Sequence, residues 1–152
     1  MFHSRAMEHR INRIQDRVLR LIYPNQHQLT FKELLEKNKT VSIHQRNLQT
    51  LATEIYKAKN KISPEVVNSL FEFTNKNYNL RNASILKRNR YFTVHYGRES
   101  LVSLAPKIWE LVPDSIREVK TLSIFKNKIK AWTTDKCPCR LCKNYIGQVG
   151  FI

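Results

Sequence analysis

The chain has 152 residues, of which 27 are Lys or Arg and 12 are Asp or Glu, so its formal net charge is +15 at pH 7. Hydrophobic residues make up 41% and aromatic residues 10% of it, which excludes a disordered basic tail and fits one ordinary folded domain. No apolar run approaches the about 18 residues of a membrane-spanning helix. Residues 1–10 lack the apolar core of a secretion signal, so we expect an intracellular protein of the cytoplasm or nucleus. The charge favours a polyanionic partner, either RNA or DNA or an anionic membrane surface.

The first predicted element is an amphipathic helix over residues 7–22. Apolar residues recur there at steps of three and four, the spacing of one helical face: Met7, Ile11, Ile14, Val18, Leu21 and Ile22. Arginines recur at the same steps on a neighbouring face: Arg10, Arg13, Arg17 and Arg20. We expect the apolar side to dock while the guanidinium groups reach a phosphate backbone. The alternative is that these arginines are the solvated flank of a core helix.

Two capping boxes open the next helices. Thr30 and Glu33 have the Thr-x-x-Glu form and predict a short helix over 31–37. Ser42, followed by Gln in the third position, opens a longer helix over 43–59. Its predicted buried face consists of Leu48, Leu51, Ala52, Ile55 and Tyr56.

The composition changes after residue 60. Pro64, placed between a serine and a glutamate, predicts a helix over 64–73. Residues 75–82 contain four asparagines (NKNYNLRN) and favour turns. Residues 91–96 (YFTVHY) have high β propensity and predict one strand or extended segment.

Two apolar patterns predict the last helices. Leu101, Leu104, Ile108 and Leu111 share one face of a helix over 101–111, although Pro106 would allow a start nearer Ala105. Residues 113–115 predict a turn. The final helical face consists of Leu122, Phe125, Ile129 and Trp132. We therefore predict a mostly α fold, a small helical domain with one short extended segment near 91–96 and a Cys-rich C-terminal tail. Its parts would be an amphipathic basic helix over 1–23, a helical domain over 24–132 and the tail over 133–152.

The acidic residues argue against an enzyme. Asp16, Asp114 and Asp135 are isolated in the sequence, so no aspartate pair is present to hold the metal ions of a polymerase or nuclease. No glycine-rich phosphate loop occurs. The sequence indicates no catalytic partner for His44 or His95, and a structural role is the expectation for both.

Three cysteines lie close together near the C-terminus, as Cys137, Cys139 and Cys142. Thiolates at this spacing suit zinc, but a closed structural site needs four ligands. His95, Asp135 or a cysteine of another chain would have to supply the fourth. The alternative is three reduced thiols in a basic tail.

Several segments together resemble the extreme C-terminal region of reverse transcriptases from non-LTR (LINE-type) retrotransposons, covering nearly the whole chain. They are residues 14–23 (IQDRVLRLIY), 31–35 (FKELL), 44–48 (HQRNL), 51–57 (LATEIYK), 62–65 (ISPE), 78–82 (YNLRN), 104–113 (LAPKIWELVP) and 137–142 (CPCRLC). The resemblance implies the end of the thumb region and the domain after it, which hold template RNA or target DNA. The family's endonuclease and polymerase domains lie upstream of this region, and their catalytic aspartates have no counterpart here.

We therefore expect a non-catalytic nucleic-acid-binding fragment of a reverse transcriptase (RNA-directed DNA polymerase) family. The candidate phosphate contacts are Arg10, Arg13, Arg17, Arg20, Arg81, Lys87, Arg88, Arg90, Lys126, Lys128 and Lys130. Tyr91, Phe92 and Tyr96 would stack on single-stranded bases or, alternatively, pack in the core.

Two other hypotheses remain open. One is a protein-interaction or scaffolding module, whose apolar surface would pack on the missing polymerase portion or on another protein. The other is a pseudogene remnant without a selected function.

Overall fold

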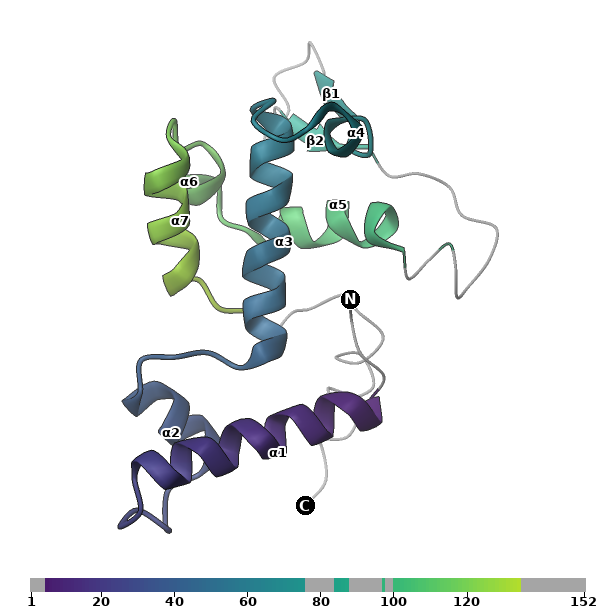
Figure 1. Cartoon of the computed structure of the whole chain (residues 1–152). Coiled ribbons are helices and arrows are strands. Elements are labelled where there is room, and N and C mark those ends of the chain that lie inside the picture. Colours follow the sequence, from purple (N-terminus) through teal and green to yellow (C-terminus); the bar gives the residue numbers. More distant parts are fainter. Residues whose placement is uncertain (1–4, 76–83, 88–96, 98–99, 135–152) are drawn as a thin grey trace. The chain divides into compact units, whose positions relative to one another are not determined.

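The computed structural model describes residues 5–75, 84–87, 97 and 100–134. These residues are mostly helical, which confirms the predicted fold class (Figure 1). The chain divides into two compact units, Met1–Leu48 and Gln49–Ile152. The division predicted from the sequence, with boundaries after residues 23 and 132, stays a prediction. In the described ranges no helix combines the length and the apolar character needed to cross a membrane.

The first unit is built around helices α1 (Arg5–Ile22) and α2 (Phe31–Lys37), which pack on each other. The predicted capping box is present at the start of α2. The Thr30 backbone N–H donates to the Glu33 carboxylate at 2.7 Å, and the Glu33 N–H donates to the Thr30 hydroxyl at 3.4 Å. This pairing satisfies two backbone groups that a helix N-terminus otherwise leaves open, which explains why so short a helix begins at Phe31.

The docking side of α1 is not the one that the apolar pattern predicted. Within the first unit, Leu19 is buried at 3% exposure, whereas Ile14, Val18, Leu21 and Ile22 are 61%, 50%, 81% and 54% exposed. Hydrogen bonds to loop carbonyls hold the docked side: the Gln15 side chain donates to Val41 at 3.0 Å. Periodicity counts apolar residues and cannot register such bonds, so the prediction was wrong on this point.

Helix α3 (Ile43–Lys59) has the predicted bounds and contains the division between the units. Its predicted buried face is confirmed: Leu48, Ala52, Ile55 and Tyr56 are buried and Leu51 is half-buried. Spacings of three and four residues put these side chains on one stripe of the helix.

Helix α5 (Leu101–Leu111) begins at the first of its two predicted starts. The Ser100 hydroxyl accepts a hydrogen bond from the Ser103 N–H at 3.3 Å and so caps the helix ahead of Pro106. Pro106 lies buried in the second turn, where it lacks the N–H that would bond to the carbonyl four residues earlier. The cap and the burial together outweigh that loss.

Two helices complete the second unit. The turn predicted over 113–115 is wrong at Asp114 and Ser115, which begin the one-turn helix α6 (Asp114–Arg117) after Pro113, and α7 (Leu122–Ala131) follows. The predicted face of α7 is confirmed, because Phe125, Ile129 and Trp132 are buried and Leu122 is half-buried.

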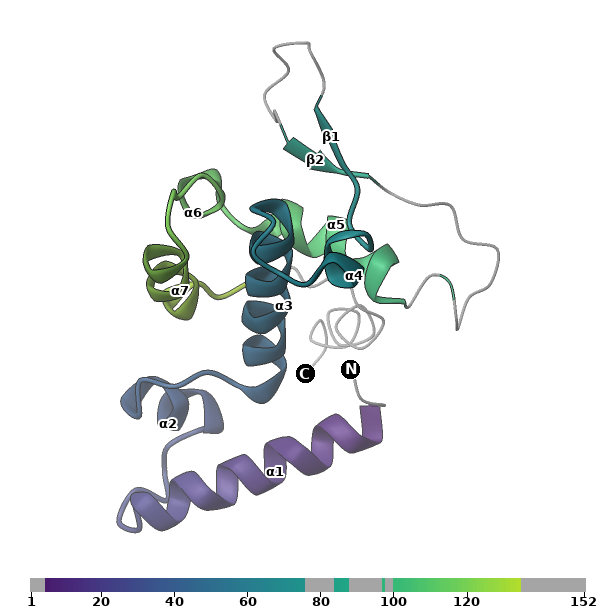
Figure 2. The same ribbon diagram turned by 45° about the horizontal axis from the view of Figure 1, so that its top comes forward.

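The helix predicted over 64–73 is wrong for most of its length, because the chain leaves the helix after Asn68 and enters a short β hairpin at Phe73. Only α4 (Glu65–Asn68) is helical there. Strand β1 (Phe73–Asn75) pairs antiparallel with β2 (Ser84–Leu86), as Figure 2 shows. Neither strand was predicted, because each is three residues long and is stabilised by its distant partner rather than by local pattern. The extended segment predicted over 91–96 lies outside the described residues.

The core of the second unit centres on three aromatic rings from three helices. Tyr56 of α3 stacks on Phe125 of α7 with centroids 4.1 Å apart, and Trp109 of α5 lies 6.3 Å from Phe125. The Tyr56 hydroxyl donates to the Val119 carbonyl at 2.6 Å. These contacts fix α5 and α7 against α3.

Candidate nucleic-acid interface

Three arginines form a row along the exposed side of α1. Arg10, Arg13 and Arg17 are all exposed, and none has an ion-pair partner within the described part of the chain. At about 100° per residue their positions fall within an arc of about 60°, and they span about 10 Å along the helix axis. The row is therefore a cationic strip on one side of α1, and its guanidinium groups are exposed to an incoming anion.

Arg20, the fourth arginine of the predicted stripe, has different surroundings. Its Nε donates to Asp16 at 2.9 Å, and a terminal nitrogen donates to the Leu29 carbonyl at 3.3 Å. Arg20 thus joins α1 to the loop before α2, and Asp16 neutralises its charge. The even spacing of the four arginines in the sequence does not distinguish Arg20, which bonds within the fold, from the three arginines that are exposed.

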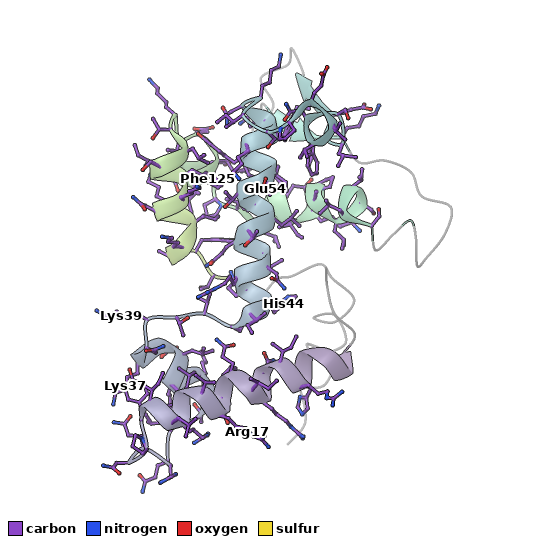
Figure 3. The ribbon with its side chains drawn as sticks, in the orientation of Figure 1. Arg17, Lys37, Lys39, His44, Glu54 and Phe125 are labelled. Carbon is purple, nitrogen blue, oxygen red and sulfur yellow. The ribbon has the colours of Figure 1, made fainter. Side chains whose placement is uncertain are left out.

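The same unit holds basic residues that the sequence reasoning missed. Lys37 and Lys39, at and just after the end of α2, are exposed, and Arg17 projects from the middle of α1 (Figure 3). The Lys37 ammonium lies 5.0 Å from the centre of the Tyr23 ring, a cation–π contact that orients it. The sequence signal for these two lysines is the Lys-Asn-Lys run over residues 37–39, at the end of α2.

A second basic surface lies on α7, in the other unit. Lys126 and Lys130 are exposed one turn apart, on a side of the helix about 100° from the buried Phe125 and Ile129. Lys128 is exposed too, but its ammonium donates to the Ser115 carbonyl at 3.2 Å and so links α7 to α6. Among the residues that the structure describes, Lys126 and Lys130 are the lysines of this helix whose ammonium groups have no bond within those residues to compete with a phosphate.

The predicted basic segment over 81–90 is described only in part. Lys87 pairs with Glu72 at 2.6 Å, and its backbone N–H donates to the Glu72 carbonyl at 2.8 Å. The pairing of β1 with β2 brings these two residues together from 15 positions apart. Arg81, Arg88 and Arg90 lie outside the described residues.

The candidate metal ligands also fall outside the described ranges. Cys137, Cys139 and Cys142 are beyond residue 134, as is Asp135, and His95 lies in the 88–96 gap together with Tyr91, Phe92 and Tyr96. Within the ranges that are described, no three His, Cys, Asp or Glu side chains gather around one point. Zinc binding by the cysteines stays a prediction.

The two described aspartates are each paired with an arginine of their own helix. Asp16 accepts from Arg20, and Asp114 accepts from Arg117. His44 lies half-buried in the first turn of α3 (Figure 3). The chemistry that this arrangement offers is electrostatic: fixed guanidinium and ammonium groups that bind phosphate oxygens.

Comparison with known proteins adds no assignment. No family model, curated protein or solved structure matches the chain. The likeness to the C-terminal region of reverse transcriptases therefore stays a prediction that depends on the sequence segments named above, and the basic surfaces of α1 and α7 are the features from which a function is argued.

Proposed function

We propose that the chain is a non-catalytic nucleic-acid-binding domain, the C-terminal part of a retroelement reverse transcriptase, and that it contacts template RNA or target DNA. The observation that carries this proposal is the row of Arg10, Arg13 and Arg17 on α1, exposed and without acidic partners in the described ranges. A net charge of +15 supports the same class of partner.

The rigidity of α1 makes the row suited to phosphates. Leu19 and the bond of Gln15 hold the opposite side of the helix, and the bonds of Arg20 hold its C-terminal end, so the three guanidinium groups are presented together. Each guanidinium can bind a phosphate through two parallel N–H bonds. Each phosphate neutralised also releases condensed counterions, which makes the affinity fall as salt rises.

A fluorescence-polarisation titration of the full chain tests the proposal. Labelled single-stranded RNA, duplex DNA and heparin are titrated at about 50 mM and about 200 mM NaCl. The informative variant is R10Q/R13Q/R17Q. Its matched control is K32Q/K61Q/K120Q, which removes the same charge from exposed lysines elsewhere.

We expect RNA binding to weaken steeply with salt. For single strands the slope of log K against log salt is about −0.7 per phosphate contact. The arginine variant removes three contacts, so its slope should be less steep by about 2. The control variant should keep most of its affinity. An RNA affinity that does not change with salt would overturn the proposal, and equal losses in both triple variants would overturn the role of the α1 row.

A further inference from the structure

We propose that the exposed apolar side of α1 is a docking seam for an amphipathic helix of another protein, one that carries Asp or Glu along its edge. The seam consists of Ile14, Val18 and Leu21, with the half-buried Ile11 at its start. This inference goes beyond nucleic-acid binding and concerns a partner of a different class.

The spacing of the seam is that of helix-to-helix packing. Ile11, Ile14, Val18 and Leu21 follow steps of three, four and three, so they form one nearly straight ridge along α1. Val18 and Leu21 have the order of a β-branched residue and then a leucine that two-stranded helix pairs use, and Ile11 and Ile14 precede them on the ridge. The last three side chains are 61%, 50% and 81% exposed, although the helix is anchored through Leu19 on its other side.

The charges beside the seam specify the partner. Arg10 and Arg17 border one edge of the ridge, and the other edge carries the uncharged Gln15 and Ile22. Within residues 9–22 the single acid is Asp16, and it is paired with Arg20. A helix with an acidic edge would pair with the free arginines while burying its own apolar stripe against the ridge.

A second copy of this chain does not meet that requirement. A parallel copy of α1 would bring Arg10 opposite Gln15 and Arg17 opposite Ile22, and an antiparallel copy would place arginines opposite arginines. Neither arrangement supplies an acid, and the second is repulsive.

A lipid surface also fits less well than a helix. Helices that lie in a bilayer interface commonly insert Trp or Phe beside their leucines, and the seam is purely aliphatic. Tyr23, the aromatic residue that follows α1, already makes contacts within the unit and is not available to insert into a bilayer. Its ring lies under Lys37, and its hydroxyl donates to Asn38 at 3.3 Å. The narrow aliphatic ridge favours a protein helix.

The test uses the full chain and two synthetic helical peptides of about three heptads. Both carry Ile and Leu at the seam positions; one has Glu at the flanking positions and the other has Lys. Anionic phospholipid vesicles and single-stranded RNA are further arms. The informative variant is V18Q/L21Q, and its matched control is I62Q/V66Q, which changes two apolar residues exposed elsewhere.

We expect the Glu peptide to bind and the Lys peptide not to bind. V18Q/L21Q should lower the affinity for the Glu peptide at least about ten-fold, since two apolar side chains leave the interface, while RNA binding stays within about two-fold. I62Q/V66Q should leave the peptide affinity unchanged.

Three results would overturn the inference. The first is equal binding of both peptides. The second is binding to the vesicles that V18Q/L21Q abolishes, together with no binding of the Glu peptide. The third is a melting temperature lowered by V18Q/L21Q, because the seam would then be packed within the chain itself. Loss of RNA binding in the arginine variant concerns the proposed function alone, so the two proposals fail separately.

Discussion

The ring of Tyr56 lies nearly parallel to the ring of Phe125, with centroids 4.1 Å apart and planes inclined by 20°. Phe125 points from α7 toward α3 (Figure 3), and both rings are almost fully buried. This pair joins two helices that are far apart in sequence, and through Trp109 it also joins α5. The stability of the second unit depends on this cluster.

Replacing Phe125 with alanine should lower the free energy of unfolding by about 3–5 kcal/mol, because the cavity left between α3 and α7 cannot close fully. F125L should cost less, since it fills more of the space. The neighbouring Ile124 is 49% exposed, and I124A should change stability by no more than about 0.5 kcal/mol. Urea unfolding followed by the fluorescence of the buried Trp109 and Trp132 measures all three variants. Equal losses for F125A and I124A would contradict the assigned core.

Gln49 of α3 holds the C-terminal end of α7 in place. Its side-chain amide donates to the carbonyls of Lys130 at 3.1 Å and Trp132 at 2.9 Å, and Gln49 itself is buried. Q49M keeps the volume but removes both donors, so it should destabilise the chain by about 2 kcal/mol. Q28M, at an exposed position, is the control. The same unfolding experiment applies, and an unchanged midpoint for Q49M would show that the two carbonyls find other donors.

Substitution of Arg13 should affect RNA binding, and substitution of Arg20 should affect stability. R13Q should weaken RNA binding and leave the melting temperature unchanged, because Arg13 is exposed and has no described ion-pair partner. R20Q should lower stability by about 1 kcal/mol through loss of the bonds to Asp16 and Leu29, with a smaller effect on RNA binding. Thermal unfolding and fluorescence polarisation on each variant give the two readouts. The reverse pattern would mean that Arg20 is a phosphate contact.

The capping box of α2 should make its stability depend on pH. Hydrogen bonds from the Thr30 backbone N–H and then from its hydroxyl lower the pKa of Glu33 below the ordinary 4.5. A carboxyl with a lowered pKa stabilises the fold above pH 4.5, and the contribution is lost as the pH falls through the folded-state pKa. T30A should reduce this contribution, because it removes the hydroxyl and keeps the backbone N–H, whereas T30S should retain it in full. Circular-dichroism melting between neutral and acidic pH compares them, and identical pH profiles for T30A and the parent chain would refute the link.

Lys59 should produce a similar rise in stability with pH, but in the alkaline range. Burial lowers its pKa below 10.5, repulsion from Arg117 lowers it further, and Glu118 partly offsets both. The unfolded chain then holds more protons than the folded chain, so stability should rise as the pH rises through the folded-state pKa toward 10.5. K59M should raise stability at neutral pH and flatten this rise. K61M, at an exposed position, is the control. Parallel stability profiles for K59M and the parent chain would contradict the assignment.

Local patterns predicted the bounds of α2, α3 and α5 and the buried faces of α3 and α7. The Thr30 and Ser42 caps gave the starts of α2 and α3, and spacings of three and four gave the buried faces of α3 and α7. Such features depend on residues within one or two turns of each other, so a sequence pattern carries them completely. The β hairpin was not predicted because Phe73 pairs with Leu86, which is distant in sequence. A three-residue strand is also too short to show the alternation of apolar and polar residues that identifies strands.

The candidate site shows the same limit. The sequence by itself determined that α1 carries arginines and apolar residues on neighbouring sides, that basic residues greatly exceed acids, and that the aspartates are isolated. Only the tertiary structure decided that α1 docks through Leu19 and leaves Ile14, Val18 and Leu21 exposed, and that Arg20 and Lys87 are neutralised by Asp16 and Glu72. The physical reason is that burial and ion pairing depend on which loop carbonyl, acid or strand comes close in space. Helical period fixes the side of α1 on which a residue lies, and the rest of the fold decides which side is covered.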